Sequence, residues 1–437
     1  MYRFALILRH PSKLWQSLLI MIIRQPNRTS ASHAICCFWV SCVCLTGLCI
    51  SAATAQPRYI PEPTAVVLSA SVHAGNGQNS GLRSFDAAWR AKPQDPAAAL
   101  AYARAVFTLG LKEGDLRWFG SAKAALAPWW DAAQMSAEGF FLRGLVKQGF
   151  HNFDDGLKDI HRAIELEPQR AEFWSWRFAL HLLMAKTADA QQDIAQMESL
   201  IGKAEADIYR GILFYRTGQS ANAIQLLSRA KQSAAYQDAS SQDWLGFHLG
   251  EALRVNGQPG QAIAVWVQRL KSNPQSHLIR LSLSELYNQQ KDFAQAKQVA
   301  LYQPDTANIT DALLMQALLA SRGLKDADQA RLASLMDARL KAQALRQESL
   351  IERPKLIYQI AYGQDVAAGL ALSIENWHLQ KEPPDAVLFV QAALALGQAK
   401  SALPVVEWAA KTGYTDPQLS LLIQQLKAHP SWTQKAS

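Results

Sequence analysis

Five side chains that could bind a metal ion lie near one another in the sequence: His151, Asp154, Asp155, Asp159 and His161. In a helix, Asp155 and Asp159 would share a face, and His151 would stand in the turn before it. Carboxylate and imidazole groups in this arrangement could bind a transition metal. The alternative is that these positions face solvent, where acidic residues near a helix N-terminus are stabilised by the helix dipole. We favour the solvent-facing interpretation and predict no metal site.

A second group surrounds Trp377 and could catalyse proton transfer. His378 would be the general base, which needs an orienting acid and a concave site. Glu375 lies one helical turn from His378, and Glu382 follows. A surface pair explains the same spacing. The sequence also has no serine nucleophile elbow, HExxH pair, phosphate loop or calcium loop. We therefore predict that the chain is not an enzyme and needs no cofactor.

All the cysteines lie in one apolar stretch, residues 34–50, near the start of the chain. Basic residues precede this stretch, and the small residues of 51–55 follow it. A positive start, an apolar run and a small-residue ending predict a secretory signal peptide over residues 1–55, with cleavage after Ala55. The mature chain would then contain no cysteine, which excludes disulfides, thiol nucleophiles and cysteine zinc sites.

Two alternatives for this leader stay open. The true start is Met1 or Met21, because the chain from Met21 has the same order of features. The leader could also remain as an uncleaved anchor in the inner membrane, since its apolar stretch almost reaches bilayer length. In either case the basic residues of the leader stay on the cytoplasmic side of the membrane, so we expect the chain after the leader to lie in the periplasm. Membrane contact is expected only through a retained leader.

The formal net charge of +8 is concentrated at the N-terminus. Residues 1–55 contain five basic side chains and no acidic one, and the rest of the chain carries nearly equal numbers of both. A balanced body offers no electrostatic surface for nucleic acid, so we predict no such partner. The 49% hydrophobic content excludes a wholly disordered chain.

Three regions are expected after the leader. Residues 56–84 contain prolines and a glycine-rich run, which predict an extended connector. Beyond them, apolar residues recur at intervals of three and four, which predicts helices. Regularly spaced glycines and prolines divide these helices into about seven or eight hairpins. We expect a repeat array over residues 85–345, and degenerate hairpins with a tail over residues 346–437. Breaks are predicted at Gly110–Gly114, Gly149–Asn152, Pro168, Gly218, Gly257–Gly260, Pro274, Gly323, Pro383-Pro384 and Gly413.

The array shows internal similarity when Gly144, Gly211 and Gly250 are aligned. Small residues stand twelve positions later and bulky apolar residues four positions beyond those. The small residues are Gly156, Ala223 and Ala262, and the bulky ones are Ile160, Leu227 and Trp266. Small residues let two helices approach closely, and bulky ones fill the remaining space. Repeats would start near Ala137, Ala171, Ala204, Asp243 and His277, at spacings of 34, 33, 39 and 34.

This pattern resembles the tetratricopeptide repeat, a helix–turn–helix unit of 34 residues. The copy starting at Ala137 matches best, and the copy starting at Ala171 departs because Phe178 stands where a small residue is expected. The resemblance implies an all-α fold in which hairpins stack into an α-solenoid, a right-handed superhelix. No single repeat can bury its apolar face, so neighbouring hairpins must pack together.

The resemblance also implies a binding site. In the tetratricopeptide family, fixed positions of each first helix line the concave groove of the superhelix. Their mixture of aromatic, arginine and acidic side chains here is typical of a protein-binding surface, and implies a protein or peptide partner. We call these positions the groove residues. They are Phe141, Leu145, Ile212, Tyr215, Arg216, Trp244, Phe247, Glu251, Arg254, Glu285 and Asn288.

A narrower resemblance concerns two further segments. Asn376–Asp385 and Ala124–Trp129 look like blocks found in exported bacterial repeat proteins without assigned function. This implies bacterial origin and no known activity. We expect an exported scaffold that mediates protein–protein interaction through its groove. The alternative is a component of cell-envelope assembly or polysaccharide handling, because aromatic side chains also stack on sugars. An enzyme built around His378 is a third, weaker alternative.

Overall fold

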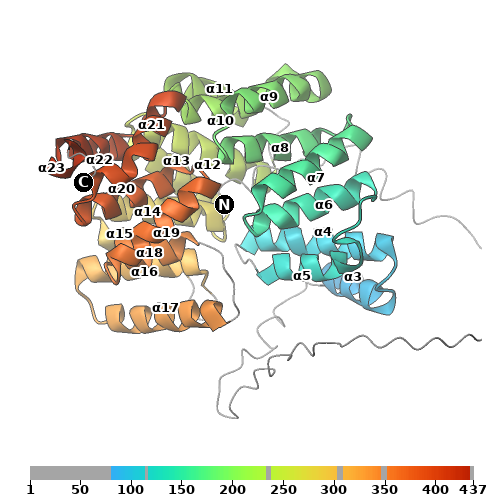
Figure 1. The fold of residues 1–437 in the computed structure, drawn as a ribbon, viewed down its shortest axis with the longest axis horizontal. Helices are drawn as coiled ribbons and strands as arrows, with labels where there is room; N and C mark the ends of the chain where they lie inside the picture. Colours follow the sequence, from blue (N-terminus) through green and yellow to red (C-terminus); the bar gives the residue numbers. More distant parts are fainter. Residues whose placement is uncertain (1–79, 114–116, 233–237, 303–308, 346–351, 434–437) are drawn as a thin grey trace, which may run out of the picture. The chain divides into compact units, whose positions relative to one another are not determined.

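The computed structural model of the protein describes residues 80–113, 117–232, 238–302, 309–345 and 352–433. The predicted signal peptide and almost all of the predicted connector lie outside these residues. The first described helix, α3 (Ser80–Ala91), begins within the range expected for the connector. Every described element is an α-helix or a short 3-10 helix, which confirms the all-α prediction (Figure 1). No helix among the described residues is both long and apolar enough to cross a membrane.

From α4 to α19 the chain forms successive pairs of helices that contact each other (Figure 1). Helices of neighbouring pairs also contact one another, for example α10 with α12 and α12 with α14. The structure is therefore the expected α-solenoid. The pairs are α4 (Pro96–Glu113) with α5 (Arg117–Leu126), α6 (Ala137–Gly149) with α7 (Phe153–Leu166), α8 (Ala171–Leu183) with α9 (Thr187–Ile201), α10 (Lys203–Arg216) with α11 (Ser220–Gln232), α12 (Ala239–Val255) with α13 (Pro259–Ser272), α14 (His277–Gln289) with α15 (Phe293–Ala300), α16 (Asp311–Leu324) with α17 (Asp328–Leu345), and α18 (Arg353–Ile360) with α19 (Val366–Leu379).

The last part of the chain adds shorter elements. They are α20 (Pro383–Ala395), the 3-10 helix η7 (Ala399–Ala402), α21 (Leu403–Thr412), α22 (Pro417–Ala428) and α23 (Pro430–Thr433). Another 3-10 helix, η4 (Ala127–Trp129), follows α5. We call residues 352–433, from the start of α18 onward, the C-terminal block. In this block α20 contacts α18, α19 and α22.

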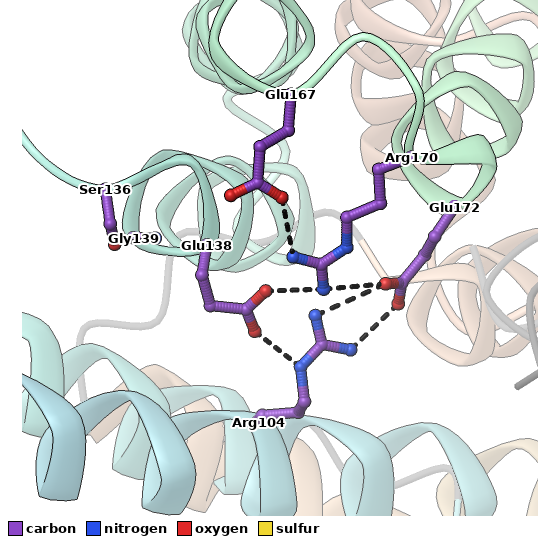
Figure 2. Close-up of polar contacts among 7 residues, drawn as sticks. All are labelled: Arg104, Ser136, Glu138, Gly139, Glu167, Arg170 and Glu172. Carbon is purple, nitrogen blue, oxygen red and sulfur yellow. Dashed lines mark hydrogen bonds and ion pairs between the residues drawn. The ribbon is translucent and has the colours of Figure 1, made fainter. Parts of the chain in front are cut away.

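The helix boundaries follow from local sequence. Side chains accept hydrogen bonds from backbone N–H groups at several helix starts, which satisfies donors that the helix itself leaves unpaired. Ser136 does so for Gly139 at the start of α6 (Figure 2), and Asp416 does so for Leu419 at the start of α22. Gly218 and Gly413 end their helices with positive φ angles of 78° and 73°, a conformation that glycine adopts without strain. Both are breaks that the sequence predicts.

The aligned glycines have equivalent surroundings in the structure. A Cβ atom added to Gly144 would lie 3.0 Å from Ile160, and one added to Gly211 would lie 3.1 Å from Leu227. At Gly250 it would lie 2.1 Å from the indole nitrogen of Trp266. The three bulky residues are completely buried. The predicted packing of a small residue on the first helix against a bulky one on the second is confirmed in all three pairs.

A charged contact recurs with the same repeat. Arg143 of α6 donates two hydrogen bonds to Asp159 of α7, at 2.8 and 2.6 Å. One pair later, Arg177 of α8 donates two to Asp193 of α9, at 2.9 and 2.7 Å. Both contacts join residues that are 16 positions apart, and both carboxylates are buried. Arg143 binds both oxygens of its carboxylate, whereas both donors of Arg177 bind Oδ1 of Asp193. Because hydrogen bonds between charged groups are strong, these contacts hold the two helices of each pair in one register.

Candidate partner-binding face

The groove residues lie on the first helices α6, α10, α12 and α14, as the repeat alignment predicts. None of them is exposed: eight are buried, and Arg254, Glu285 and Asn288 are half-buried. Part of this burial comes from the array itself, since the rings of Phe141 and Phe173 lie 4.5 Å apart between α6 and α8. The C-terminal block also packs against groove residues of α10 and α12, where Arg216 binds Glu382 and Arg254 binds Asp416.

The contact between α10 and the C-terminal block is made by the chain between α19 and α20. The backbone N–H of Lys381 donates to the carbonyl of Leu183, at the end of α8, at 2.8 Å. Arg216 donates to the carboxylate of Glu382 at 3.1 Å and to the carbonyl of Lys381 at 3.3 Å. Gln380 and Glu382 have extended backbone angles. A short extended segment of the chain is thus bound across the ends of two first helices by backbone and side-chain contacts.

A second contact joins α12 to the start of α22. Arg254 forms ion pairs with Asp416 and, at 3.1 Å, with Glu251. Burial opposes the charge of the guanidinium, but the carboxylates of Glu251 and Asp416 outweigh it and raise the pKa of Arg254. Nearby, a Cβ added to Gly218 would lie 2.1 Å from the carbonyl oxygen of Gly413. Only glycine therefore permits this close approach between the α10–α11 turn and the C-terminal block.

A third arginine, Arg353 of α18, belongs to the C-terminal block and lies beside the segment that Arg216 binds. It donates to Asp385 at 2.7 Å, and its guanidinium is 3.8 Å from the carboxylate of Glu382. Burial favours the neutral form of Asp385, but the charge and hydrogen bond of Arg353 dominate and lower the pKa of Asp385. Gln380 also donates to Asp385 at 2.9 Å. The segment that Arg216 binds is thus held in place from the other side.

A small cavity of about 20 Å³ remains between the array and the block, which is room for one water molecule. His248 is buried beside it, with Nδ1 2.8 Å from the hydroxyl oxygen of Tyr215. Its Nε2 has no hydrogen-bond partner among the described residues. Desolvation lowers the pKa of His248 to about 3. The lining is Tyr215, Arg216, Phe247, His248, Glu251, Glu382, Pro383, Pro384 and Tyr414.

At the N-terminal end of the array, a network of ion pairs joins three successive first helices (Figure 2). Arg104 of α4 contacts Glu138 of α6 at 2.5 Å and Glu172 of α8 at 2.8 Å. Arg170 contacts Glu138 at 2.6 Å and Glu172 at 3.1 Å, and Glu167 at 3.5 Å. Burial alone would raise the pKa of Glu138, but the hydrogen bonds and charges of the two arginines lower it. The guanidinium of Arg104 lies 5.4 Å from the ring centroid of Phe141, where a cation is attracted to the ring.

The metal-binding group of the sequence does not converge. Asp154 is exposed, Asp155 pairs with Lys158 at 2.8 Å, and His161 pairs with Glu165 at 3.3 Å. Within the described ranges, no three side chains of the metal-binding types form a site. Our solvent-facing interpretation was wrong for Asp159, which is buried between Arg143 and Lys147. The reason is that its helix face turns toward α6, where two basic residues compensate its charge.

The group around Trp377 does not converge either. Glu375 and His378 are exposed on α19. Glu382, in contrast, is 1% exposed and engaged by Arg216. Trp377 is buried, with its ring centroid 5.4 Å from that of Trp408. The segment Asn376–Asp385, which the narrower resemblance singled out, is therefore a part of the C-terminal block that contacts the array.

Sequence reasoning missed several of the residues that form these contacts. A signal was present for the network in Figure 2, because Arg104 and Glu138 are 34 positions apart, and Arg104 and Glu172 are 68 apart. These spacings are one and two repeats. For Asp416 no local signal existed, since its partner Arg254 lies 162 positions away in the sequence. Arg353 lies 32 positions from Asp385, in a part of the chain where we expected the repeat pattern to be degenerate.

Comparison with known proteins agrees with this geometry. The family model described as tetratricopeptide repeat matches residues 247–303, which include groove residues of α12 and α14. No curated protein sequence matches the chain significantly. Similar solved structures include Pseudomonas aeruginosa pilF, with 16% identity, a TM-score of 0.35, and coverage of 49% of this chain and 97% of that chain.

Two other similar structures come from different proteins. The human IFIT1 dimer with PPP-AAAA has 11% identity and a TM-score of 0.34, covering 80% of this chain and 87% of that chain. The P58(IPK) TPR domain has 16% identity and a TM-score of 0.20, and the match covers 77% of this chain and 99% of that chain. Because these scores are low, the assignment rests on the family match and on the recurring packing of the helix pairs. Together these two observations show that the chain contains tetratricopeptide repeats.

Proposed function

We propose that the protein is an exported, non-enzymatic scaffold whose groove residues bind a segment of another protein. The observation that supports this is the bound segment around Lys381 and Glu382. The ends of α8 and α10 bind it through its backbone as well as its carboxylate. A surface that already binds an extended chain segment has the chemistry needed to bind another one, because main-chain contacts are available from any sequence.

Site-specific photo-crosslinking in the native envelope tests this proposal. A photoreactive residue at Glu285, a half-buried groove position on α14, is expected to give a discrete protein adduct. The matched control is Lys158, an exposed position on the second helix α7. Adducts that form only from position 158, or equally from both positions, would contradict binding through the groove. A glycan adduct at position 285 would support polysaccharide handling instead.

Export is a separate part of the proposal and has its own test. The order of basic, apolar and small residues over 1–55 supports secretion with cleavage after Ala55. N-terminal sequencing of the protein from a periplasmic fraction should then begin at Gln56. A chain that begins at Met1 or Met21 and sediments with membranes would show instead that the leader is retained as an anchor.

A further inference from the structure

We infer that the groove residues of α10 and α12 form a receptor for an acidic, proline-containing protein segment, and that the C-terminal block occupies this receptor as an internal competitor. The inference rests on the proposed function and specifies the chemistry of the partner. Four features of the contact carry it: how the segment is bound, what surrounds its two prolines, where a second carboxylate is bound, and which polar atoms the internal segment leaves without a partner.

The bound segment is recognised at three consecutive groups. Leu183 accepts from the N–H of Lys381, while Arg216 donates to the carbonyl of Lys381 and to the carboxylate of Glu382. An arginine that contacts both a main-chain carbonyl and the next side-chain carboxylate requires an extended backbone and an acidic residue at that place. Burial of Glu382 to 1% exposure makes the acidic residue essential, since an unpaired Arg216 would be left in the interior.

The surroundings of Pro383 and Pro384, which follow Glu382, explain why we expect prolines in the partner segment. Pro383 and Pro384 line the cavity together with Tyr215 and Phe247 of the array. Proline has no backbone N–H, so it can pack against aromatic rings in a confined space without leaving a donor unpaired. Its fixed φ angle also reduces the entropy lost when a segment is bound. A partner segment with Glu-Pro-Pro would reproduce these contacts.

Arg254 provides a second anchor on the next first helix. It binds Asp416, a residue outside the Glu-Pro-Pro segment, although both carboxylates come from the C-terminal block. Two arginines on successive first helices thus each bind a carboxylate of the block. A partner with two separated acidic residues could occupy both anchors, while a partner with one would compete only at Arg216.

The internal segment fits incompletely, which allows exchange. Among the described residues of α12, Nε2 of His248 and Nε1 of Trp244 are buried without a hydrogen-bond partner. A buried polar group without a hydrogen-bond partner destabilises the state that contains it. Buried ion pairs contribute little net stability because desolvation offsets their attraction. An external segment that pairs even one of these atoms would gain an advantage over the internal segment.

A peptide-binding experiment with the full chain tests the inference. The probe is a fluorescent synthetic peptide with the sequence of residues 379–386, and the control peptide has glutamine in place of the glutamate. We expect the E382Q/D416N variant, whose internal segment has lost both anchored charges, to bind the probe at least about tenfold more tightly than wild type. Glutamine in the control peptide, or R216M in the same variant, should abolish this binding.

The matched control for the protein is D243N. Asp243 is buried and paired with Arg269 at 2.8 Å, but both residues lie within the α12–α13 pair. Its loss should destabilise the protein without increasing peptide binding. A gain in D243N as large as that in E382Q/D416N would overturn the inference, because it would reflect loosening of the whole structure.

Hydrogen exchange of the wild-type protein keeps the inference testable if E382Q/D416N does not fold. Saturating probe peptide should speed the exchange of amides in α20 and α22 while leaving α6 and α7 unchanged. Unchanged exchange in α20 and α22, or no binding of the probe to any variant, would overturn the inference. The proposed function would still stand in that case if position 285 crosslinks a partner in the envelope.

Discussion

Gly250 shows at the scale of one residue why the repeat pattern is strict. Its α-carbon lies so close to Trp266 that an added Cβ would be 2.1 Å from the indole nitrogen. Because Trp266 is completely buried, its ring has no space into which to move. The alignment of glycine with a bulky residue sixteen positions later was readable from the sequence because it depends only on neighbouring helices.

We predict that Gly250→Ala lowers the free energy of unfolding by about 1–3 kcal/mol, the range typical of overpacking. The control is Gly120→Ala in α5, where an added Cβ meets nothing within 4 Å. That change should stabilise the protein by about 0.5–1 kcal/mol, since alanine is the better helix former. Urea titrations of both variants measure the difference. Equal effects of the two substitutions would show that the close contact at Gly250 does not exist.

Buried histidines make the protein sensitive to acid. Desolvation lowers the pKa of His277 to about 4 and that of His248 to about 3. Desolvation is also the main cause that lowers the pKa of His151 to about 4. The ordinary value is 6.5, so below this pH the unfolded chain binds more protons than the folded protein. The free energy of unfolding must therefore fall as the pH drops from 6.5 toward 4.

We predict that lowering the pH from 7 to 5 reduces the free energy of unfolding, with a contribution on the order of 1–2 kcal/mol from His277. His277→Gln should remove this contribution and flatten the pH dependence. Exposed His378 is the control, and His378→Gln should keep the wild-type difference between the two pH values. A stability that is unchanged or higher at pH 5 in wild type would contradict the burial of these rings.

At the scale of one helix, the sequence predicted where several helices begin and end. The sequence predicts breaks at Pro383-Pro384 and Gly413, and in the structure α20 begins at Pro383 and α21 ends just before Gly413. Such boundaries depend on local signals, namely helix-starting prolines and helix-ending glycines. Asp159 shows the limit of local signals. An acidic residue near a helix start is typical of a solvent-facing position, and only the partner helix, which carries Arg143 and Lys147, makes burial possible.

Ion pairs join neighbouring helix pairs at the N-terminal end of the array. Glu138 of α6 contacts Arg104 of α4 and also Arg170, which precedes α8. We predict that Glu138→Gln destabilises the protein by about 1–2 kcal/mol and that added salt reduces the difference, because the network is only partly shielded from solvent. The control is Glu165→Gln, which breaks an exposed contact with Arg162 inside α7 and should leave stability almost unchanged, because exposed ion pairs contribute little.

Thermal and urea unfolding at low and high salt measure this coupling between neighbouring pairs. If Glu138→Gln and Glu165→Gln have the same small effect, the contacts drawn in Figure 2 do not join the pairs energetically.

At the scale of the whole molecule, the sequence predicted the kind of fold but not the contact that covers the groove residues. Arg216 and Glu382 are 166 positions apart, and Arg254 and Asp416 are 162 apart. Periodicity describes how a helix packs on its neighbours, so it holds no information about such distant partners. Arg216 and Arg254 were predicted to bind another protein, and in the structure they bind Glu382 and Asp416 in the C-terminal block of their own chain.

The central claim is that the C-terminal block packs against the groove residues, and a double-mutant cycle tests it most directly. Arg254→Met, Asp416→Asn and the double variant are compared with wild type by urea unfolding; asparagine keeps the helix cap at the start of α22. We predict a coupling energy of about 1–3 kcal/mol between the two residues. Effects that add to within about 0.3 kcal/mol would contradict the contact, and with it the arrangement of block and array.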